Sequence, residues 1–252
     1  MNKPTDIGKN RTGVAASPID SRRLETGAQI DAPMPTDGYL LETERVRWAR
    51  EAPPVGTVPP PASVKGVVKT ALEGMKGHKA TVLLDKLGER IAFERTGTRL
   101  YEALLAKVEA AHVHVGGPTR GEVEKIRDDE RQHFALLRDC MIQLGGDPTA
   151  MTPGADVIAV ASTGWVQVLA DPRTTLTQCL DIMLTAELAD NDGWSLLIEL
   201  VQGMKQDEIA SRFRTALEEE DEHLVKVRGW VSAALVGQAG VAPTPEQPGT
   251  RA

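Results

Sequence analysis

The chain has 252 residues and a formal net charge of −7, a balance that argues against nucleic acid as its main partner. Its two cysteines, Cys140 and Cys179, form no spaced framework, which favours buried thiols in a reducing compartment over a disulfide scaffold. No stretch reaches the roughly 18 apolar residues of a membrane helix. The N-terminus also lacks an apolar leader, so we expect a cytoplasmic protein without a membrane partner.

The N-terminal region is rich in proline and lacks a hydrophobic period. Residues 1–62 hold nine of the 16 prolines, and the run from Pro53 to Pro61 favours extended polyproline. We therefore predict that residues 1–77 form a largely irregular arm. It is either a flexible surface segment or a docking segment for a partner or a neighbouring subunit.

Amphipathic helices dominate the chain after the arm, and the first is expected from about His78 to about His112. Its apolar residues step by three and four, the spacing that places side chains on one face of a helix. The sequence Thr119-x-x-Glu122 has the form of a capping box, so it predicts the start of a second helix, which glycines end near Leu144. Because the link between the two helices is short, we expect them to be antiparallel.

The link from the second to the third long helix is about 25 residues, enough to cross the bundle from end to end. Thr152-Pro153 has the form of a helix start, and the apolar stretch that ends at Leu169 predicts a short crossing helix. Asp171-Pro172 is interpreted as an N-cap followed by proline at the first position of the third long helix.

The third long helix is expected to end at Gly203, and the fourth to run from Asp207 to Gly237. These two are again joined by a short link and should be antiparallel. The predicted fold class is therefore all-α, with a four-helix bundle over residues 78–236. The tail, residues 237–252, is rich in proline and expected to be disordered.

Four carboxylates and two imidazoles occupy positions on the apolar faces of these helices, where leucine would be expected. They are Glu94 in the first helix, Glu130 and His133 in the second, Glu187 in the third, and Glu220 and His223 in the fourth. A buried carboxylate without a partner is costly, so it must be protonated, paired or bound to a cation. Four negative charges would balance two divalent cations, and imidazole suits iron as well as manganese or zinc. The pattern predicts a site for two metal ions.

This order of residues, one Glu and then Glu-x-x-His in each half of the bundle, resembles the ferritin-like superfamily of di-iron carboxylate proteins. That superfamily includes bacterioferritins, rubrerythrins and the ribonucleotide reductase small subunit. The resemblance implies a ferritin-like bundle of two antiparallel helix pairs with a long crossover between the second and third helices. It also implies that Glu130 and Glu220 bridge the metals, and that Glu94 and Glu187 are terminal ligands. Tyr101 lies seven residues after Glu94, where ferritins often carry a tyrosine near the site.

By the same resemblance, the chain is expected to be a di-iron oxidoreductase that oxidises Fe(II) with dioxygen or peroxide, as a ferroxidase or a peroxidase. Glu130, Glu220 and Tyr101 would then be catalytic, and the cofactor would be two iron ions, with manganese as the alternative. The long arm and the crossover helix depart from an ordinary storage ferritin, and no Cys-x-x-Cys pairs provide the rubredoxin-type module of rubrerythrins. We expect a homo-oligomer, a dimer rather than a large cage. Two other functions stay open, a non-catalytic binding or scaffold module and a manganese catalase-like enzyme.

Polar residues beside the ligand positions have a structural or a functional interpretation. Asp129 could orient a ligating histidine, with a solvated position on the helix surface as the alternative. Asp190 and Asn191 lie one turn from the glutamate of the third helix and could contact ligands or water. The acidic run in the fourth helix is interpreted as a solvated face formed by Glu218, Glu219, Asp221 and Glu222.

Overall fold

The structure, a computed structural model, describes residues 17–30, 39–58, 80–111 and 113–241. Seven helices and no strand lie within these ranges, so the all-α prediction is confirmed for the described chain. Residues 3–54 form one compact unit, and the chain from Val55 onward forms the other. None of the described helices is long and apolar enough to cross a lipid bilayer.

The first unit contains two short helices, α1 (Pro18–Ile30) and α2 (Tyr39–Glu51), where the sequence predicted a largely irregular arm. The prediction is wrong for these two stretches. In α2, Arg47 pairs with Glu44 at 2.6 Å and with Glu51 at 3.2 Å, which are the spacings that place charges side by side on a helix. Such local pairs stabilise short helices without an apolar period, which explains why the hydrophobic pattern did not reveal them.

Parts of the predicted arm and tail lie outside the described residues. In the arm, residues 52–58 are described and are not helical, whereas residues 59–77 are among those not described. At the other end, the last helix continues past Gly237, and Gly240 ends it with a left-handed backbone (φ 64°). Glycine adopts this conformation without steric cost, so it is the usual residue just after a helix. The predicted tail beyond residue 241 is not described.

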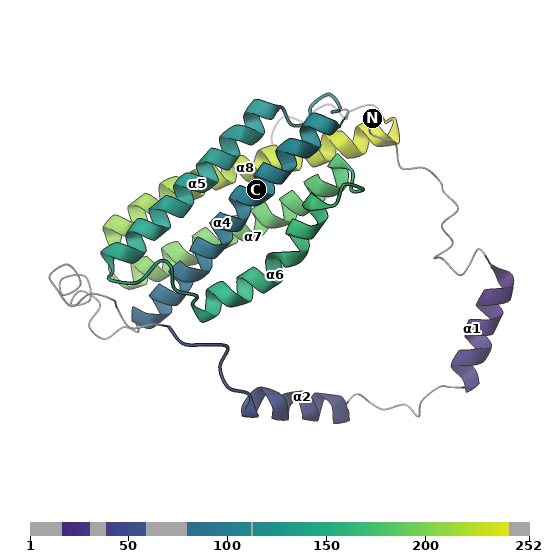
Figure 1. Cartoon of the computed structure of the whole chain (residues 1–252), viewed down its shortest axis with the longest axis horizontal. Helices are drawn as coiled ribbons and strands as arrows, with labels where there is room; N and C mark the ends of the chain where they lie inside the picture. Colours follow the sequence, from purple (N-terminus) through teal and green to yellow (C-terminus); the bar gives the residue numbers. More distant parts are fainter. Residues whose placement is uncertain (1–16, 31–38, 59–79, 112, 242–252) are drawn as a thin grey trace, which may run out of the picture. The chain divides into compact units, whose positions relative to one another are not determined.

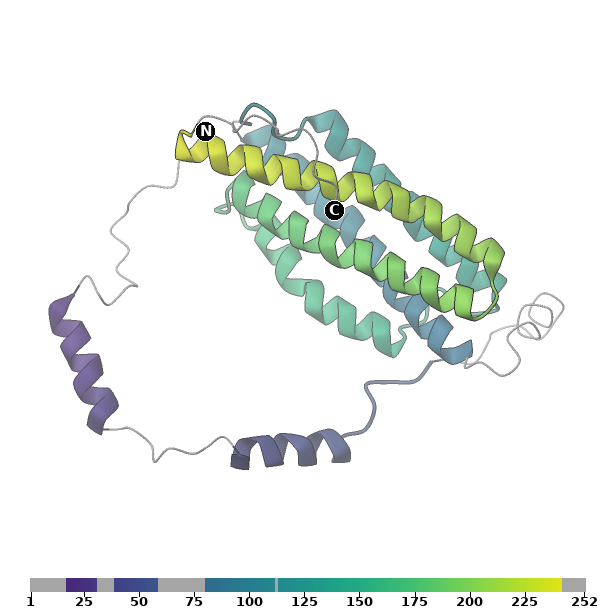
Figure 2. The same ribbon diagram turned by 180° about the vertical axis from the view of Figure 1, so that it is seen from behind.

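Four long helices form the bundle as two packed antiparallel pairs (Figures 1 and 2). One pair is α4 (Ala80–Ala110) and α5 (Arg120–Gln143), and the other is α7 (Leu176–Gly203) and α8 (Asp207–Ala239). The capping box predicted at the start of α5 is present, since the Thr119 hydroxyl accepts from the backbone of Glu122 and the Glu122 side chain accepts in return. The short links allow each helix to fold back along its predecessor.

The crossover contains its own helix, α6 (Pro153–Ala170), as predicted, and α6 packs along α4 (Figure 1). Thr152 caps its start by accepting from the backbone of Ala155. The predicted start of α7 at Asp171 is wrong, because Asp171 is the C-cap of α6, and α7 begins after a capping box at Thr175. Asp-Pro can follow one helix as well as precede another, and the sequence pattern does not distinguish the two cases.

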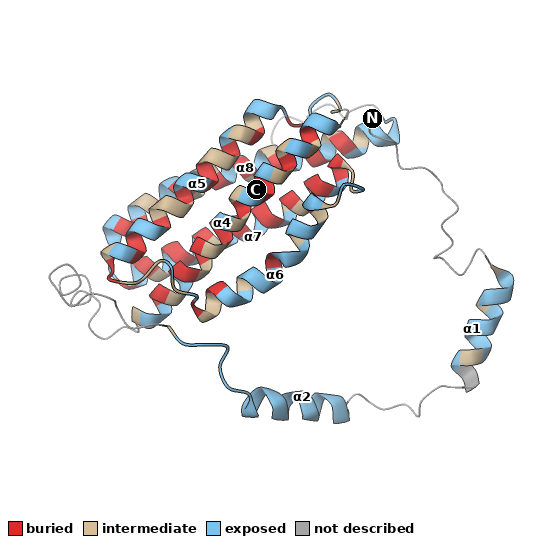
Figure 3. Ribbon diagram, in the orientation of Figure 1, coloured by how far each residue is buried: buried red, intermediate tan, exposed pale blue. Residues whose placement is uncertain are grey.

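Two apolar clusters fill the bundle, one on each side of a polar belt. In α4, apolar residues between 83 and 91 belong to one cluster and those between 100 and 108 to the other, with Glu94 between them. The same division recurs in α5, α7 and α8, and Figure 3 shows the buried residues on the inner sides of the helices. Burial of each large aliphatic side chain contributes about 1.5–3 kcal/mol. The two clusters therefore offset the cost of placing charged groups in the middle.

Candidate metal centre

All six side chains that the sequence placed on the apolar faces lie in this central belt. None is more than 2% exposed, and they come from all four helices of the bundle: Glu94, Glu130, His133, Glu187, Glu220 and His223. Gly97 of α4 makes room for the site, because a Cβ there would collide with the carboxylate of Glu130. The local reason for the convergence is the helical spacing, which points each of these residues into the core together with its apolar neighbours.

The ligand-type atoms of these residues form overlapping groups whose members lie within 4.8 Å of one another. One group is Glu130, Glu187, Glu220 and His223; another is Glu94, His133 and Glu220; a third is Glu94, Glu130, Asp190 and Glu220. Glu220 belongs to every group, and Glu130 is grouped both with Glu94 and with Glu187. The two glutamates therefore lie between the other ligand positions, the place that a bridging carboxylate would need.

Several of these atoms are buried without a hydrogen-bond partner. Among the described residues they include Glu94 Oε2, Glu130 Oε2, His133 Nδ1, Glu187 Oε2 and Glu220 Oε1. His133 Nδ1 lies 2.7 Å from Glu220 Oε1, but the two atoms lack the alignment of a hydrogen bond. Because buried polar atoms in folded proteins are almost always paired, the unpaired oxygens of Glu94, Glu130 and Glu187 fit a cation bound between them.

The outer nitrogen of each histidine contacts a carboxylate from the opposite helix. His223 Nε2 of α8 lies 3.1 Å from Asp129 Oδ2 of α5, and His133 Nε2 of α5 lies 2.8 Å from Glu219 Oε2 of α8. Such contacts fix a histidine's tautomer and ring orientation, leaving Nδ1 of both rings for the cluster. The orienting role considered for Asp129 is therefore supported by this geometry. The sequence placed Glu219 on a solvated face, and this prediction needs correction. The side chain is 44% exposed, but its carboxylate contacts His133 of the site.

Arg90 is the functional candidate that the sequence analysis missed. It is 4% exposed and lies in the belt, where its guanidinium pairs with Glu94 Oε1 at 2.5 Å and with Asp190 of α7. The ring of Phe93 packs 4.5 Å from the guanidinium carbon. Gly193 of α7 leaves the space that the guanidinium fills, because an added Cβ would collide with it. The available signal was the position of Arg90 one turn before Glu94, on the same face of α4.

Asp190 and Asn191, which the sequence considered as contacts for ligands or water, separate in the structure. Asp190 is buried, pairs with Arg90 and belongs to one of the candidate ligand groups. Asn191 instead donates from Nδ2 to Asp221 Oδ1 at 2.6 Å, near the surface. Only Asp190 therefore belongs to the site.

Tyr101 lies in the belt but contacts a different glutamate from the one on its own helix. Its hydroxyl donates to Glu187 Oε1 of α7, and the side chain is fully buried. Burial and the neighbouring Glu187 raise the pKa of Tyr101 well above its usual value. The residue is therefore a neutral donor that positions Glu187, while its predicted role in catalysis stays a prediction.

Burial raises the pKa of three of the four glutamates, whereas the fourth is held ionised. Desolvation, with repulsion from Glu220, raises the pKa of Glu130 and brings that of Glu187 to about 8. The pKa of Glu94 is also raised, mainly by burial. Burial also opposes ionisation of Glu220, but contacts from the two histidines prevail and lower its pKa to about 2. Without metal, Glu220 is thus an anion between histidines.

The histidine pKa values follow from the same contacts. Burial lowers the pKa of His133, but Glu220 and Glu94 outweigh that effect and raise it to about 9. The pKa of His223 is also raised, with Glu220 again outweighing burial. Both imidazoles therefore take up protons readily when no metal is bound. A cation that binds here must displace those protons, because only the neutral ring can coordinate it.

The buried charges sum to a value that two divalent cations would neutralise. Five carboxylates of the belt are at most 2% exposed: Glu94, Glu130, Glu187, Asp190 and Glu220. Arg90 offsets one of them, which leaves four negative charges when all the carboxylates are ionised. Opposite charge in a low-dielectric interior is strongly stabilising, so two M(II) ions would remove the penalty of burying these groups.

The fold and the site define a class of protein, an all-helical bundle with a buried cluster of carboxylates and histidines that is a candidate metal centre. Comparison of the chain with protein-family models, with curated proteins and with solved structures gave no match.

Proposed function

We propose that this chain is a ferritin-like dinuclear metal protein that oxidises Fe(II) with dioxygen or peroxide. The observation that carries the proposal is the convergence of four glutamates and two histidines at the centre of one bundle. The ligand set repeats in the two helix pairs in the order of di-iron carboxylate proteins. The packed antiparallel pairs and the crossover helix α6 are compatible with a ferritin-like connection.

Two adjacent Fe(II) ions would supply the two electrons that reduce dioxygen to peroxide, or peroxide to water, which one isolated ion supplies less readily. The task of the chain is to hold and orient the ligands. Glu130 and Glu220 are shared between the two ligand positions, and Tyr101 fixes Glu187 through its hydroxyl. Glu187 and His133 bind protons at neutral pH when no metal is present, so loading with metal would release protons from both groups.

The test is anaerobic loading with Fe(II), followed by addition of dioxygen or peroxide and measurement of ferric absorbance. We expect two Fe per chain and oxidation much faster than in buffer. Glu130→Ala should lose both properties, because it removes a shared ligand. Glu222→Ala, at an exposed position of the same acidic run, is the matched control and should behave as the unmodified chain.

The outcomes separate the proposal from its alternatives. Stoichiometric metal binding without accelerated oxidation would contradict the enzyme activity and favour a scaffold. Manganese retained through purification, with disproportionation of peroxide and no Fe(II) oxidation, would favour a manganese catalase-like enzyme. Absence of metal binding would overturn the proposal as a whole.

A further inference from the structure

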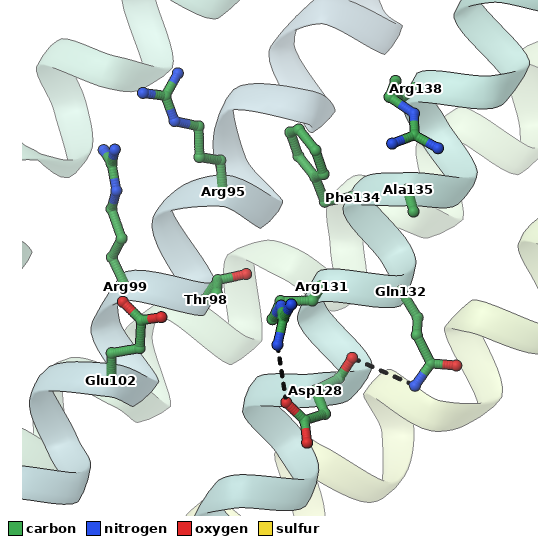
Figure 4. A pocket seen from close by; sticks show the side chains of 10 residues that line it. All are labelled: Arg95, Thr98, Arg99, Glu102, Asp128, Arg131, Gln132, Phe134, Ala135 and Arg138. Carbon is green, nitrogen blue, oxygen red and sulfur yellow. Dashed lines mark hydrogen bonds and ion pairs between the residues drawn. The ribbon is translucent and has the colours of Figure 1, made fainter.

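A groove on the outer side of α4 and α5 concentrates positive charge on a chain that is acidic as a whole (Figure 4). Its volume is about 740 Å³. Its charged lining is four arginines against two carboxylates: Arg95, Arg99, Arg131 and Arg138 against Glu102 and Asp128. The groove therefore carries two net positive charges, whereas the chain carries a net charge of −7. The term arginine groove is used below for this site.

Helical spacing lines up the arginines on the two walls. Arg95 and Arg99 are one turn apart on α4, and Arg131 and Arg138 are two turns apart on α5. All four line the same pocket; in Figure 4 the side chains of Arg95 and Arg99 extend to the side of α4 away from α5, and the ring of Phe134 lies between the two helices. Because both helices contribute arginines to one pocket, a single bound molecule has cations available from α4 and from α5.

The arginines differ in how far the protein neutralises them. Arg131 Nη1 lies 3.6 Å from Asp128 Oδ1, and Arg138 Nε donates to Asp139 at 2.8 Å. Within the described part of the chain, no carboxylate lies within ion-pair distance of Arg95 or Arg99. Like charges one helical turn apart repel each other, so an anion that binds to both would relieve the repulsion.

The chemistry of the lining selects the kind of anion. A guanidinium binds carboxylate or phosphate through two parallel hydrogen bonds, which gives geometry as well as charge recognition. Phe134 and Ala135 add an apolar surface for the body of a ligand. A long polyanion such as nucleic acid is disfavoured, because beyond the groove it would meet the net negative charge of the chain.

We propose that the arginine groove binds a small organic anion that carries at least two carboxylate or phosphate groups. The inference does not depend on the proposed oxidation of Fe(II), because none of the groove's lining residues belongs to the candidate metal centre. The two sites are nevertheless neighbours. Arg95 and Arg131 directly follow Glu94 and Glu130 in their helices, so the groove lies on the outer flank of the helices that hold the centre.

The experiment is a calorimetric titration of the full chain at low ionic strength with trimesate, an aromatic tricarboxylate, and separately with a sugar bisphosphate. Benzoate, with one carboxylate, is the probe of reduced charge. We expect saturable binding of at least one multivalent probe, and at least tenfold weaker binding of benzoate. Binding of trimesate alone assigns the groove to carboxylates, binding of the bisphosphate alone assigns it to phosphates, and binding of both supports the shared chemistry.

Two variants test whether the groove is responsible. The double variant Arg95→Gln/Arg99→Gln should bind the same probe at least tenfold more weakly, with unchanged helical content. Arg214→Gln, which removes an exposed arginine from α8, should bind as the unmodified chain does. Equal weakening in both variants would overturn the proposal, since it would show general attraction to charge. Absence of binding by the unmodified chain, or preferential binding of a short single-stranded DNA, would also overturn it.

Discussion

The two ligand positions of the candidate centre have the same sequence pattern but different surroundings. One, the Arg90 half, consists of Glu94, His133, Arg90 and Glu219; the other, the Tyr101 half, consists of Glu187, His223, Tyr101 and Asp129. In the first, Glu94 is paired with a guanidinium, and the carboxylate behind the histidine is 44% exposed. In the second, Glu187 accepts from a neutral hydroxyl, and the carboxylate behind the histidine is buried.

This difference teaches that, if two metal ions bind here, a repeated ligand motif would not give them positions of equal affinity. Arg90 occupies an oxygen of Glu94 and places a fixed positive charge beside any ion bound there. Tyr101 orients Glu187 without adding charge. Because a cation repels a second cation in a low-dielectric interior, the Tyr101 half should bind the first metal ion and the Arg90 half the second, more weakly.

The largest effect is expected from the glutamates that both halves share. Glu130→Gln and Glu220→Gln should each abolish binding of two ions, as measured by metal content after dialysis. Their metal-free stabilities should differ, because burial and neighbouring carboxylates raise the pKa of Glu130 and disfavour its charge, whereas Glu220 is an anion paired with two histidines. In chemical denaturation, Glu130→Gln should be neutral or stabilising, and Glu220→Gln should lose about 3–5 kcal/mol. Equal losses in the two variants would contradict the charge states assigned here.

Removal of the positive charge of Arg90 should reduce the difference in metal affinity between the two halves. Arg90→Gln should tighten binding of the second ion by about tenfold or more, because it frees Glu94 and removes a repulsive charge. Arg90→Lys keeps the charge and is the matched control. Competitive titration with Co(II) measures both dissociation constants. A second constant that is unchanged or weaker in folded Arg90→Gln would refute the competition between Arg90 and metal, and a structural defect cannot produce the expected gain.

A smaller effect on metal affinity is expected from the carboxylates that contact the outer nitrogens of the two histidines. Asp129→Asn should weaken binding of the first ion by on the order of 10–100-fold. This is the usual loss of metal affinity when a carboxylate that orients a ligating histidine is removed. Glu219→Gln should weaken binding of the second ion by a smaller factor, because water can replace the exposed carboxylate that contacts His133. The same Co(II) titration applies, with absorption spectra to follow each position. A larger loss in Glu219→Gln than in Asp129→Asn would reverse the assignment of the tighter half.

Much of the centre could be predicted because its ligands follow a local pattern. Glu94 and the two Glu-x-x-His motifs interrupt apolar faces at regular spacing, so the helical period alone points them into the core. Arg90 could not be assigned in this way, since its partner Asp190 comes from another helix and its space comes from Gly193. Glu219 was misassigned for a similar reason, because its contact with His133 crosses from α8 to α5.

The helices α6 and α2, outside the four-helix bundle, also show which features the hydrophobic pattern can and cannot predict. The crossover helix α6 was predicted from an apolar stretch and a Thr-Pro start, and it is present. The helix α2 was not, because side-chain ion pairs stabilise it rather than an apolar face. Periodicity therefore identifies elements that pack into a core, and it is silent about elements and contacts that depend on charge.

The last prediction concerns the response of the metal-free protein to pH. Glu187 has a folded pKa of about 8 against an ordinary 4.5, and His133 about 9 against 6.5. The folded state therefore binds more protons than the unfolded chain, so stability falls as pH rises through these values. Thermal unfolding at pH 6 and pH 9 should give the lower Tm at pH 9, and added metal should reverse the trend because it needs deprotonated ligands. A metal-free protein that is more stable at pH 9 would contradict these protonation states.

The central claim is that the belt binds two metal ions between Glu130 and Glu220. It is tested most directly by anomalous X-ray scattering from crystals loaded with Mn(II) or Fe(II). The account predicts two peaks at saturating metal, one beside Glu187 and His223 and one beside Glu94 and His133, with only the first at low occupancy. Absence of any peak within this cluster at saturating metal would contradict the account.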